Sequence, residues 1–213
     1  MRDIWMPPNL LSLARIALLA PVVYFLSRSG DESRLMCILL IIVAGITDGL
    51  DGWLARRMGC VSRLGIALDP IADKIFAGGL VISLVVYRDM PIWLAGVILG
   101  RDLLIMILGL ILMRGRQLSL PSNLTGKYAF TAVVVLLGSY VLDFRFGIAL
   151  FLPLTLVLLV ASLIAYGRVF LRIRAGLQPP QFKDLPAFRN ARIALTAAIS
   201  IVFLIELYIA FFN

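Results

Sequence analysis

The sequence predicts an all-α, polytopic integral membrane protein folded as a helical bundle. Two observations lead to this fold class. Hydrophobic residues make up 62% of the chain and the mean hydropathy is +1.01, whereas a soluble domain is roughly 45–50% apolar. The apolar residues also form long runs, and about 20 helical residues are needed to cross a hydrocarbon core of ~30 Å.

Seven segments are long and apolar enough to be membrane-spanning helices. They cover residues 10–27, 34–55, 65–87, 91–113, 124–142, 147–168 and 190–212. The last of them follows the polar stretch RAGLQPPQFKDLP. We therefore expect a transmembrane core over residues 1–175, a polar linker over 176–189 and an additional transmembrane helix over 190–213. No cleavable signal peptide is expected, because the first apolar segment is too long for one.

The distribution of basic residues predicts the orientation in the membrane. Lysines and arginines concentrate after the second, fourth and sixth segments, whereas the opposite connections hold only Arg28, Arg34, Arg88 and Arg145. By the positive-inside rule, the N-terminus and the basic connections face the cytoplasm, as expected for a bacterial inner membrane. The net charge of +8 is accounted for by basic loops beside anionic lipids. Membrane lipids, and no nucleic acid, are therefore the expected partners.

The side chains that are missing from the sequence limit its chemistry. The chain contains no histidine, so a general base would be a carboxylate, lysine, tyrosine or cysteine. Cys37 and Cys60 are the two cysteines, and they are too few and too far apart for a thiolate metal site. A bound metal would have oxygen ligands, which favours magnesium or manganese over zinc or copper.

Four aspartates stand out in the run TDGLDGWLARRMGCVSRLGIALDPIADK, residues 47–74. Helical spacing places Asp48 and Asp51 on one stripe with small residues, and Asp69 and Asp73 on a similar stripe of the next helix. A charge at the bilayer centre costs about 2.5–3.5 kcal/mol on insertion scales, and mutual repulsion adds to this cost. Two divalent cations bridged by shared carboxylates would offset it and would form a clamp for phosphoryl chemistry.

The residues around the aspartates suit the same chemistry. Gly52 and Gly65 leave room for a bulky ligand beside the backbone, and Arg56 is placed to pair with a phosphate. The alternative is a polar hinge in which the aspartates pair with Arg56, Arg57, Arg63 and Lys74. It is less favoured because ion pairing does not explain the small residues on both stripes.

These residues carry a resemblance to a known family. The segment DGLDGWLAR, residues 48–56, is followed by eight residues and then by GIALDPIAD, residues 65–73. This pattern resembles the signature of the CDP-alcohol phosphatidyltransferase family at all eight of its fixed positions. The segment PNLLSLAR at residues 8–15, the triplet at 100–102 and the pair at 126–127 are also similar to pieces of these enzymes. The likeness covers residues 7–170, a six-helix core, and gives no counterpart for the seventh segment.

The resemblance implies an activity and a set of site residues. Such enzymes transfer a phosphatidyl group from CDP-diacylglycerol to an alcohol and release CMP. It implies two divalent cations, magnesium or manganese, and a homodimer. The implied metal ligands are Asp48, Asp51, Asp69 and Asp73, the last also as catalytic general base. The implied nucleotide-binding residues are Asp48, Asp51, Gly52, Ala55, Arg56, Gly65 and Asp69.

Six polar residues outside the motif are candidates for binding the acceptor, namely Asn9, Arg15, Arg101, Lys127, Arg168 and Arg172. Each except Lys127 has a simpler explanation. Asn9, together with Ser12, would cap the first helix, and Arg15 would snorkel to the interface. Arg101 would form an internal ion pair with Asp102, and the last two arginines would anchor the sixth helix on the cytoplasmic side.

The sequence leaves the acceptor open. The pieces on the fourth and fifth segments resemble the phosphatidylglycerophosphate synthase and single-motif bacterial cardiolipin synthase branches. Glycerol 3-phosphate is slightly preferred, with phosphatidylglycerol or an inositol phosphate as alternatives. The segment KYAFT at residues 127–131 departs from the K-x-K-T of phosphatidylglycerophosphate synthases, and this departure favours phosphatidylglycerol.

An ion-coupled transporter is the alternative from another functional class, because intramembrane carboxylates also mark ion paths. Transporters of this kind show inverted repeats with broken helices near the midplane. This sequence has a single, unrepeated acidic cluster near the cytoplasmic ends of two helices, which favours an enzyme.

Overall fold

The computed structural model describes residues 7–58, 63–115, 124–177 and 208. For residues 7–8, 51–56, 58, 63–67 and 113–115 only the backbone is described. The predicted additional helix over 190–213 lies outside the described residues, except for Tyr208, and so does the predicted linker from residue 178 onward. Glu206, for which the sequence suggests no role, also lies outside them.

The described residues form six long helices, as the apolar segments predict. Their bounds are α1 (Pro7–Leu26), α2 (Asp31–Met58), α3 (Arg63–Tyr87), α4 (Ile92–Gly115), α5 (Leu124–Leu142) and α6 (Arg145–Arg174). Each helix contains a stretch long and apolar enough to cross a bilayer. The predicted all-α class of an integral membrane protein is therefore confirmed for this part of the chain. The largest difference between a predicted and an observed helix is at α6. The predicted segment ends at residue 168, whereas α6 continues to Arg174 and so includes both Arg168 and Arg172.

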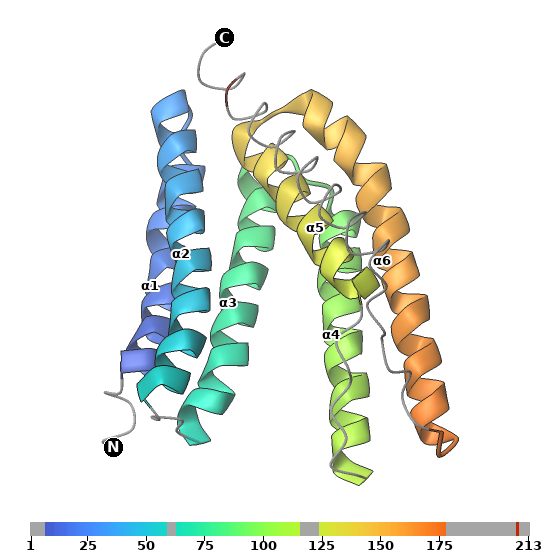
Figure 1. Cartoon of the computed structure of the whole chain (residues 1–213). Coiled ribbons are helices and arrows are strands. Elements are labelled where there is room, and N and C mark those ends of the chain that lie inside the picture. The colour runs from blue at the N-terminus through green and yellow to red at the C-terminus, as the bar shows by residue number, and fades with distance from the viewer. Residues whose placement is uncertain (1–6, 59–62, 116–123, 178–207, 209–213) are drawn as a thin grey trace. The chain divides into compact units, whose positions relative to one another are not determined.

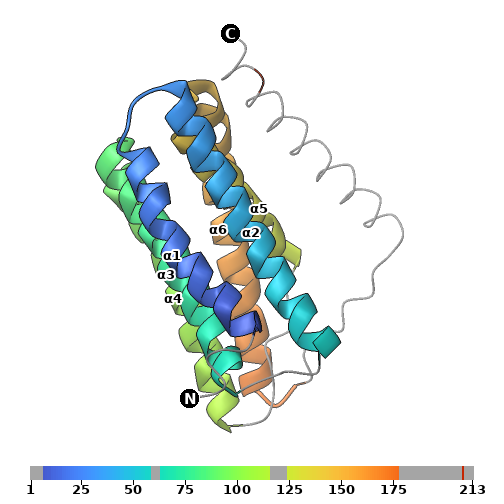
Figure 2. The same cartoon turned by 90° about the vertical axis from the view of Figure 1, so that its left-hand side faces the viewer.

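The helices divide into two compact units, Met1–Ile92 and Trp93–Asn213. In the first unit, α1 packs against both α2 and α3 (Figures 1 and 2). Val22, Leu26 and Leu84 are fully buried in this packing. A Cβ atom added at Gly79 on α3 would overlap the side chain of Leu19 on α1, so the glycine permits a close approach of these two helices.

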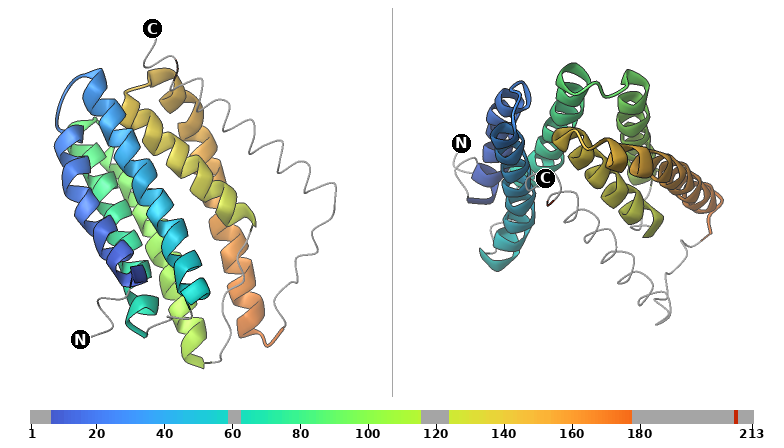
Figure 3. Two further views of the ribbon diagram at one scale, coloured as in Figure 1. Left: turned by 60° about the vertical axis from the view of Figure 1, so that its left-hand side comes forward. Right: turned by 90° about the horizontal axis from the view of Figure 1, so that it is seen from above.

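In the second unit, α5 and α6 are antiparallel neighbours (Figure 3). The fully buried Thr155 on α6 donates a hydrogen bond of 3.2 Å to the backbone carbonyl of Ala132 on α5. The connection between the helices is tight because Asp143 takes a left-handed φ of 57°. This turn lets the N–H of Phe144 donate to the carbonyl of Ser139 at 2.9 Å, which closes the C-terminus of α5.

A carboxylate cluster around Arg15

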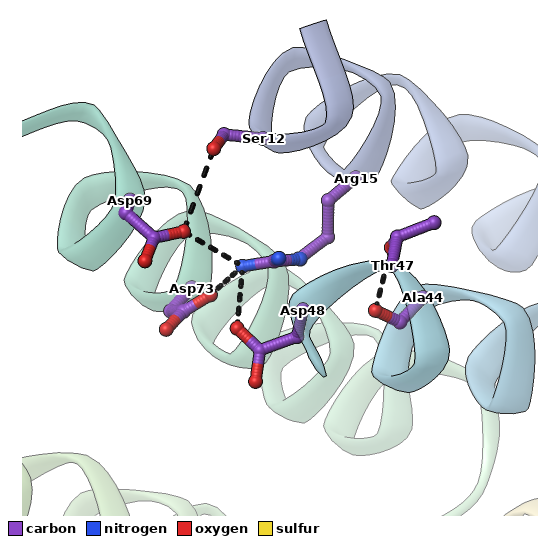
Figure 4. A network of polar contacts seen from close by, with 7 residues as sticks. All are labelled: Ser12, Arg15, Ala44, Thr47, Asp48, Asp69 and Asp73. Atoms are coloured by element: carbon purple, nitrogen blue, oxygen red, sulfur yellow. Dashed lines mark hydrogen bonds and ion pairs between the residues drawn. The ribbon is translucent and has the colours of Figure 1, made fainter. Parts of the chain in front are cut away.

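Three of the four motif aspartates lie together in the first unit. Asp48 comes from α2, while Asp69 and Asp73 lie one turn apart on α3 (Figure 4). One carboxylate oxygen from each lies within 4.8 Å of the others. The structure therefore brings together two motif halves that are separated along the chain.

An arginine from a third helix holds these carboxylates. The Nη1 atom of Arg15 on α1 lies 3.0 Å from Oδ1 of Asp48 and 3.6 Å from Oδ1 of Asp69. The same nitrogen also pairs with Oδ1 of Asp73 (Figure 4). The Arg15 side chain is only 3% exposed, and an arginine so deeply buried requires such partners because an unpaired charge is costly there.

The carboxylates are more open than the arginine. The side chains of Asp48, Asp69 and Asp73 are 53%, 42% and 46% exposed. Part of each carboxylate side chain therefore remains accessible to a ligand.

Two alternatives drawn from the sequence are wrong for α1. Because the helix begins at Pro7, Asn9 lies inside it and is 2% exposed, so it is not a capping residue. Ser12 also lies within the helix, and its Oγ donates a hydrogen bond of 3.4 Å to Oδ1 of Asp69. Arg15 does not snorkel to an interface, because its guanidinium is directed into the aspartate cluster.

The local sequence explains why α1 reaches the aspartates. Ser12 and Arg15 are three residues apart and so lie on one face of the helix. Ala44, one turn before Asp48, and Ala72, next to Asp73, are almost completely buried. These small side chains allow the helices to approach closely. The spacing of Ser12 and Arg15 in the sequence predicts that they share a helix face. It does not predict that this face contacts the aspartates.

The other motif residues are described only in part. Asp51, Gly52, Ala55 and Arg56 belong to α2, and Gly65 belongs to α3, with only the backbone described at these positions. Their contacts lie outside the described part of the structure. Their roles as metal and nucleotide ligands remain predictions.

A second polar cluster surrounds Arg101 in the second unit. Its Nη1 donates to Oδ1 of Asp102 at 2.6 Å, which confirms the expected ion pair. Its Nη2 donates to Oγ of Ser162 on α6, and its Cζ lies 6.0 Å from the ring centroid of Tyr166. The contacts with Ser162 and Tyr166 were not predicted. These two residues are four apart and share a face of α6, but their sequence gave no indication of the arginine.

The remaining acceptor candidates are exposed side chains of the same unit. Lys127 is exposed in the first turn of α5, and Arg168 and Arg172 are exposed near the end of α6. The α6 helix ends just beyond them at Arg174, and Gly176 follows with a left-handed φ of 78°. The acceptor role of these three residues remains a prediction.

The carboxylate cluster fits a divalent cation. Its oxygen donors are those that magnesium and manganese prefer, and the three oxygens lie close enough to contact one ion. The acidic cluster could thus hold a metal ion by the chemistry and spacing of its donors. The nitrogen of Arg15 contacts the same three carboxylates.

Comparison with known proteins decides the family. The model of the CDP-alcohol phosphatidyltransferase family matches residues 5–173. The chain belongs to this family. The match covers all six described helices almost completely, and it confirms the resemblance and the enzyme class predicted from the aspartate motif.

Curated relatives include enzymes of two kinds. The chain is 34% identical over 147 residues to the CDP-diacylglycerol–glycerol-3-phosphate 3-phosphatidyltransferase of Bacillus subtilis, covering 63% of this chain and 76% of the relative. It is 32% identical over 142 residues to the cardiolipin synthase (CMP-forming) of Streptomyces coelicolor, covering 62% and 66%. It is 40% identical over 125 residues to the rat cardiolipin synthase (CMP-forming), covering 58% of this chain but only 40% of the relative. A Drosophila relative is covered over 38% of its length.

Proposed function

We propose that this chain transfers a phosphatidyl group from CDP-diacylglycerol to the hydroxyl group of an alcohol and releases CMP. The observation that carries this proposal is the meeting of Asp48, Asp69 and Asp73, whose carboxylate oxygens lie within 4.8 Å of one another. They do so in a chain that the CDP-alcohol phosphatidyltransferase model matches over residues 5–173.

Four carboxylates would hold two divalent cations, magnesium or manganese. The ligands are the three clustered aspartates together with Asp51. When bound, the cations would offset the negative charge of the diphosphate and of the departing CMP. Gly52, Ala55, Arg56 and Gly65 would line the cytidine diphosphate, as the family motif implies.

Asp73 is the proposed general base. It would accept the proton of the acceptor hydroxyl at a carboxylate oxygen while the hydroxyl oxygen attacks the phosphorus of the phosphatidyl group. A new P–O bond forms, the P–O bond to CMP breaks, and CMP leaves with the bonding electrons. The 46% exposure of the Asp73 side chain allows the acceptor to reach it.

Glycerol 3-phosphate is the proposed acceptor, which would make the chain a phosphatidylglycerophosphate synthase. The Bacillus relative with that acceptor in its name is covered over 76% of its length. An anionic acceptor suits Arg101, whose guanidinium is already oriented by Asp102 and Ser162. Lys127, Arg168, Arg172, Asn9 and Arg15 are further candidates for contacts with it.

Phosphatidylglycerol is the second candidate acceptor. The KYAFT segment departs from the pattern of phosphatidylglycerophosphate synthases, and relatives named cardiolipin synthase match at 32–40% identity. Arg101 would serve this anionic lipid equally well. An inositol phosphate is a third acceptor to be tested.

The proposed setting follows from the amphiphilic donor. Its nucleotide must reach the cytoplasm while its acyl chains stay in the bilayer, so we propose a site on the cytoplasmic side that is open laterally to lipid. The half-exposed aspartates support this arrangement. We also propose a bacterial inner-membrane location, a homodimer, and a catalytic core over residues 1–175 followed by a linker and the additional helix.

The test is CMP release from CDP-diacylglycerol with magnesium or manganese, comparing the full chain with Asp73→Asn. Asp31→Asn is the matched control, because Asp31 is an exposed acid in the first turn of α2. We expect metal-dependent release that Asp73→Asn reduces at least about 10³-fold, in keeping with the loss of a base in the transition state, and that the control retains.

The acceptor is identified in the same assay by adding glycerol 3-phosphate, phosphatidylglycerol or an inositol phosphate separately. Release that requires glycerol 3-phosphate supports the preferred acceptor, and release that requires phosphatidylglycerol replaces it with the second. No metal-dependent release with any acceptor would reject the transferase and favour the ion-coupled transporter.

A further inference from the structure

We propose that Arg15 is a built-in counter-cation of the metal site, which competes with the divalent cations for Asp48, Asp69 and Asp73. Metal binding would then require the guanidinium to give up its position among these carboxylates. This inference rests on the metal-binding part of the proposed function.

A single nitrogen of Arg15 contacts three carboxylates. Nη1 of Arg15 contacts an oxygen of each of the three aspartates, at 3.0 Å for Asp48 and 3.6 Å for Asp69. A guanidinium nitrogen at this position carries only two hydrogens. Three carboxylates around it therefore cannot be explained by hydrogen bonding alone, and the nitrogen acts largely as a central positive charge.

The metal would use the same three carboxylates as the arginine. Oδ1 of Asp48, Asp69 and Asp73 faces the guanidinium, and these three carboxylates are the ones whose oxygens are grouped closely enough for one cation. A divalent cation held there would be repelled by a guanidinium a few ångströms away. The two cations therefore exclude each other from the centre of the cluster.

The three clustered carboxylates repel one another in the membrane. Three carboxylates carry three negative charges, and repulsion among charges this close is strong where the dielectric is low. Arg15 projects from α1 toward the three carboxylates (Figure 4) and neutralises one of these charges. The arginine thus gives the acidic helices a partner during insertion, at a stage when no metal is required.

The exchange has a direction. The aspartates are about half exposed, whereas the arginine is 3% exposed, so the metal would approach from the exposed side of the carboxylates. The guanidinium would move away from the incoming cation while remaining beside the site. It would then be available to a substrate, in keeping with the acceptor-binding role for which the sequence made Arg15 a candidate.

The test is Mn²⁺ binding to the full chain in detergent, measured by electron paramagnetic resonance of free Mn²⁺, with thermal unfolding followed in parallel. The variant is Arg15→Met, which removes the charge and keeps an unbranched side chain. The control is Arg34→Met, which makes the same change of charge in the first turns of α2, where Arg34 pairs with Asp31 at 3.4 Å. These turns lie roughly 20 Å along the helix from Asp48.

If Arg15 competes with the metal, Arg15→Met binds Mn²⁺ at least about tenfold more tightly than the unaltered chain, since one cation no longer has to be displaced. In EDTA, the Tm of Arg15→Met is lower than that of the unaltered chain by several degrees. Adding Mn²⁺ raises the Tm of the variant by more than it raises the Tm of the unaltered chain. Arg34→Met changes neither quantity by a comparable amount. Equal or weaker Mn²⁺ binding by Arg15→Met would overturn the inference, because it would mean that the arginine supports the metal.

A second variant covers the case in which Arg15→Met does not fold without metal. Arg15→Lys keeps the positive charge, but the lysine side chain is shorter and has no guanidinium group to reach all three carboxylates. We therefore expect this variant to fold and to bind Mn²⁺ more tightly than the unaltered chain. Unchanged or weaker binding by Arg15→Lys would reject competition. If the unaltered chain and Asp73→Asn both fail to bind Mn²⁺, the metal part of the proposed function fails and this inference fails with it. If the unaltered chain binds and the Arg15 variants bind no more tightly, only this inference fails.

Discussion

The Nη1 atom of Arg15 on α1 lies 3.0 Å from the Oδ1 atom of Asp48 on α2. This contact joins the first helix to the acidic motif, from which it is separated in the sequence. Since the same arginine also pairs with Asp73 on α3, a single side chain links all three helices of the first unit.

We expect Arg15 and Asp48 to contribute to stability together rather than independently. In a double-mutant cycle of Arg15→Met and Asp48→Asn, the coupling should be about 1 kcal/mol. The value is small because the Asp48 side chain is 53% exposed, which screens the pair. Unfolding in detergent with EDTA measures the coupling. Arg15→Met combined with Asp31→Asn should be additive, and a coupling of similar size in that pair would argue against a specific contact.

Gly126→Ala should destabilise the second unit. A Cβ atom at this position on α5 would lie 2.9 Å from the hydroxyl oxygen of Tyr166 and 3.0 Å from its Cε2. Overpacking of this kind costs about 1–3 kcal/mol, which corresponds to a Tm lower by about 2–12 °C for a chain of this size.

Gly167→Ala is the control for this prediction, because nothing lies within 4 Å of its added Cβ. It should leave the Tm unchanged or raise it slightly, as alanine favours the helix. Tyr166→Phe removes the nearest oxygen and should recover part of the loss in Gly126→Ala. Equal Tm values for the two alanine variants would contradict the close packing of α5 on Tyr166.

Ser162→Ala should weaken binding of an anionic acceptor. Ser162 accepts a hydrogen bond from Nη2 of Arg101, so its loss allows the guanidinium to move away from the position proposed for acceptor binding. We expect the KM for the acceptor to rise about tenfold, as for the loss of a hydrogen bond to a charged group, with little change in the KM for CDP-diacylglycerol. Steady-state CMP release measures both constants.

Ser139→Ala is the matched control, since this fully buried serine donates to the Val135 carbonyl of its own helix at 3.0 Å. It should leave both KM values near those of the unaltered chain. A rise in the KM for CDP-diacylglycerol in Ser162→Ala, with no change for the acceptor, would place Arg101 at the donor instead.

Cysteine labelling should show the N-terminus-inside orientation. In a background of Cys37→Ala and Cys60→Ala, Arg145→Cys lies at the exposed start of α6 and Leu177→Cys lies exposed just after its end. An impermeant maleimide applied to intact cells should label Arg145→Cys. It should label Leu177→Cys only after the membrane is permeabilised. The reverse pattern would place the basic connections outside and reject the cytoplasmic site.

The helices themselves were largely predictable. Long apolar runs must become helices in a bilayer because every backbone polar group has to be paired within the segment, and the predicted 124–142 matches α5 at both ends. The ends of α6 were less certain, because helices continue into polar flanking sequence, as the basic turn before Arg174 does. The aspartate stripes likewise predicted a group of carboxylates, and three of the four aspartates meet in the structure.

The sequence by itself determined the fold class, the family and the residues of the acidic motif, since these depend on composition, helical periodicity and fixed spacing. Only the tertiary structure decided the partners of that motif. Ser12 and Asp69 are 57 residues apart along the chain and Arg15 and Asp73 are 58 apart. Periodicity places residues on a face of their own helix, but the neighbour that this face meets depends on side-chain packing. Here, close approach at Gly79 and burial of Ala44 and Ala72 turn the Arg15 face of α1 toward the aspartates.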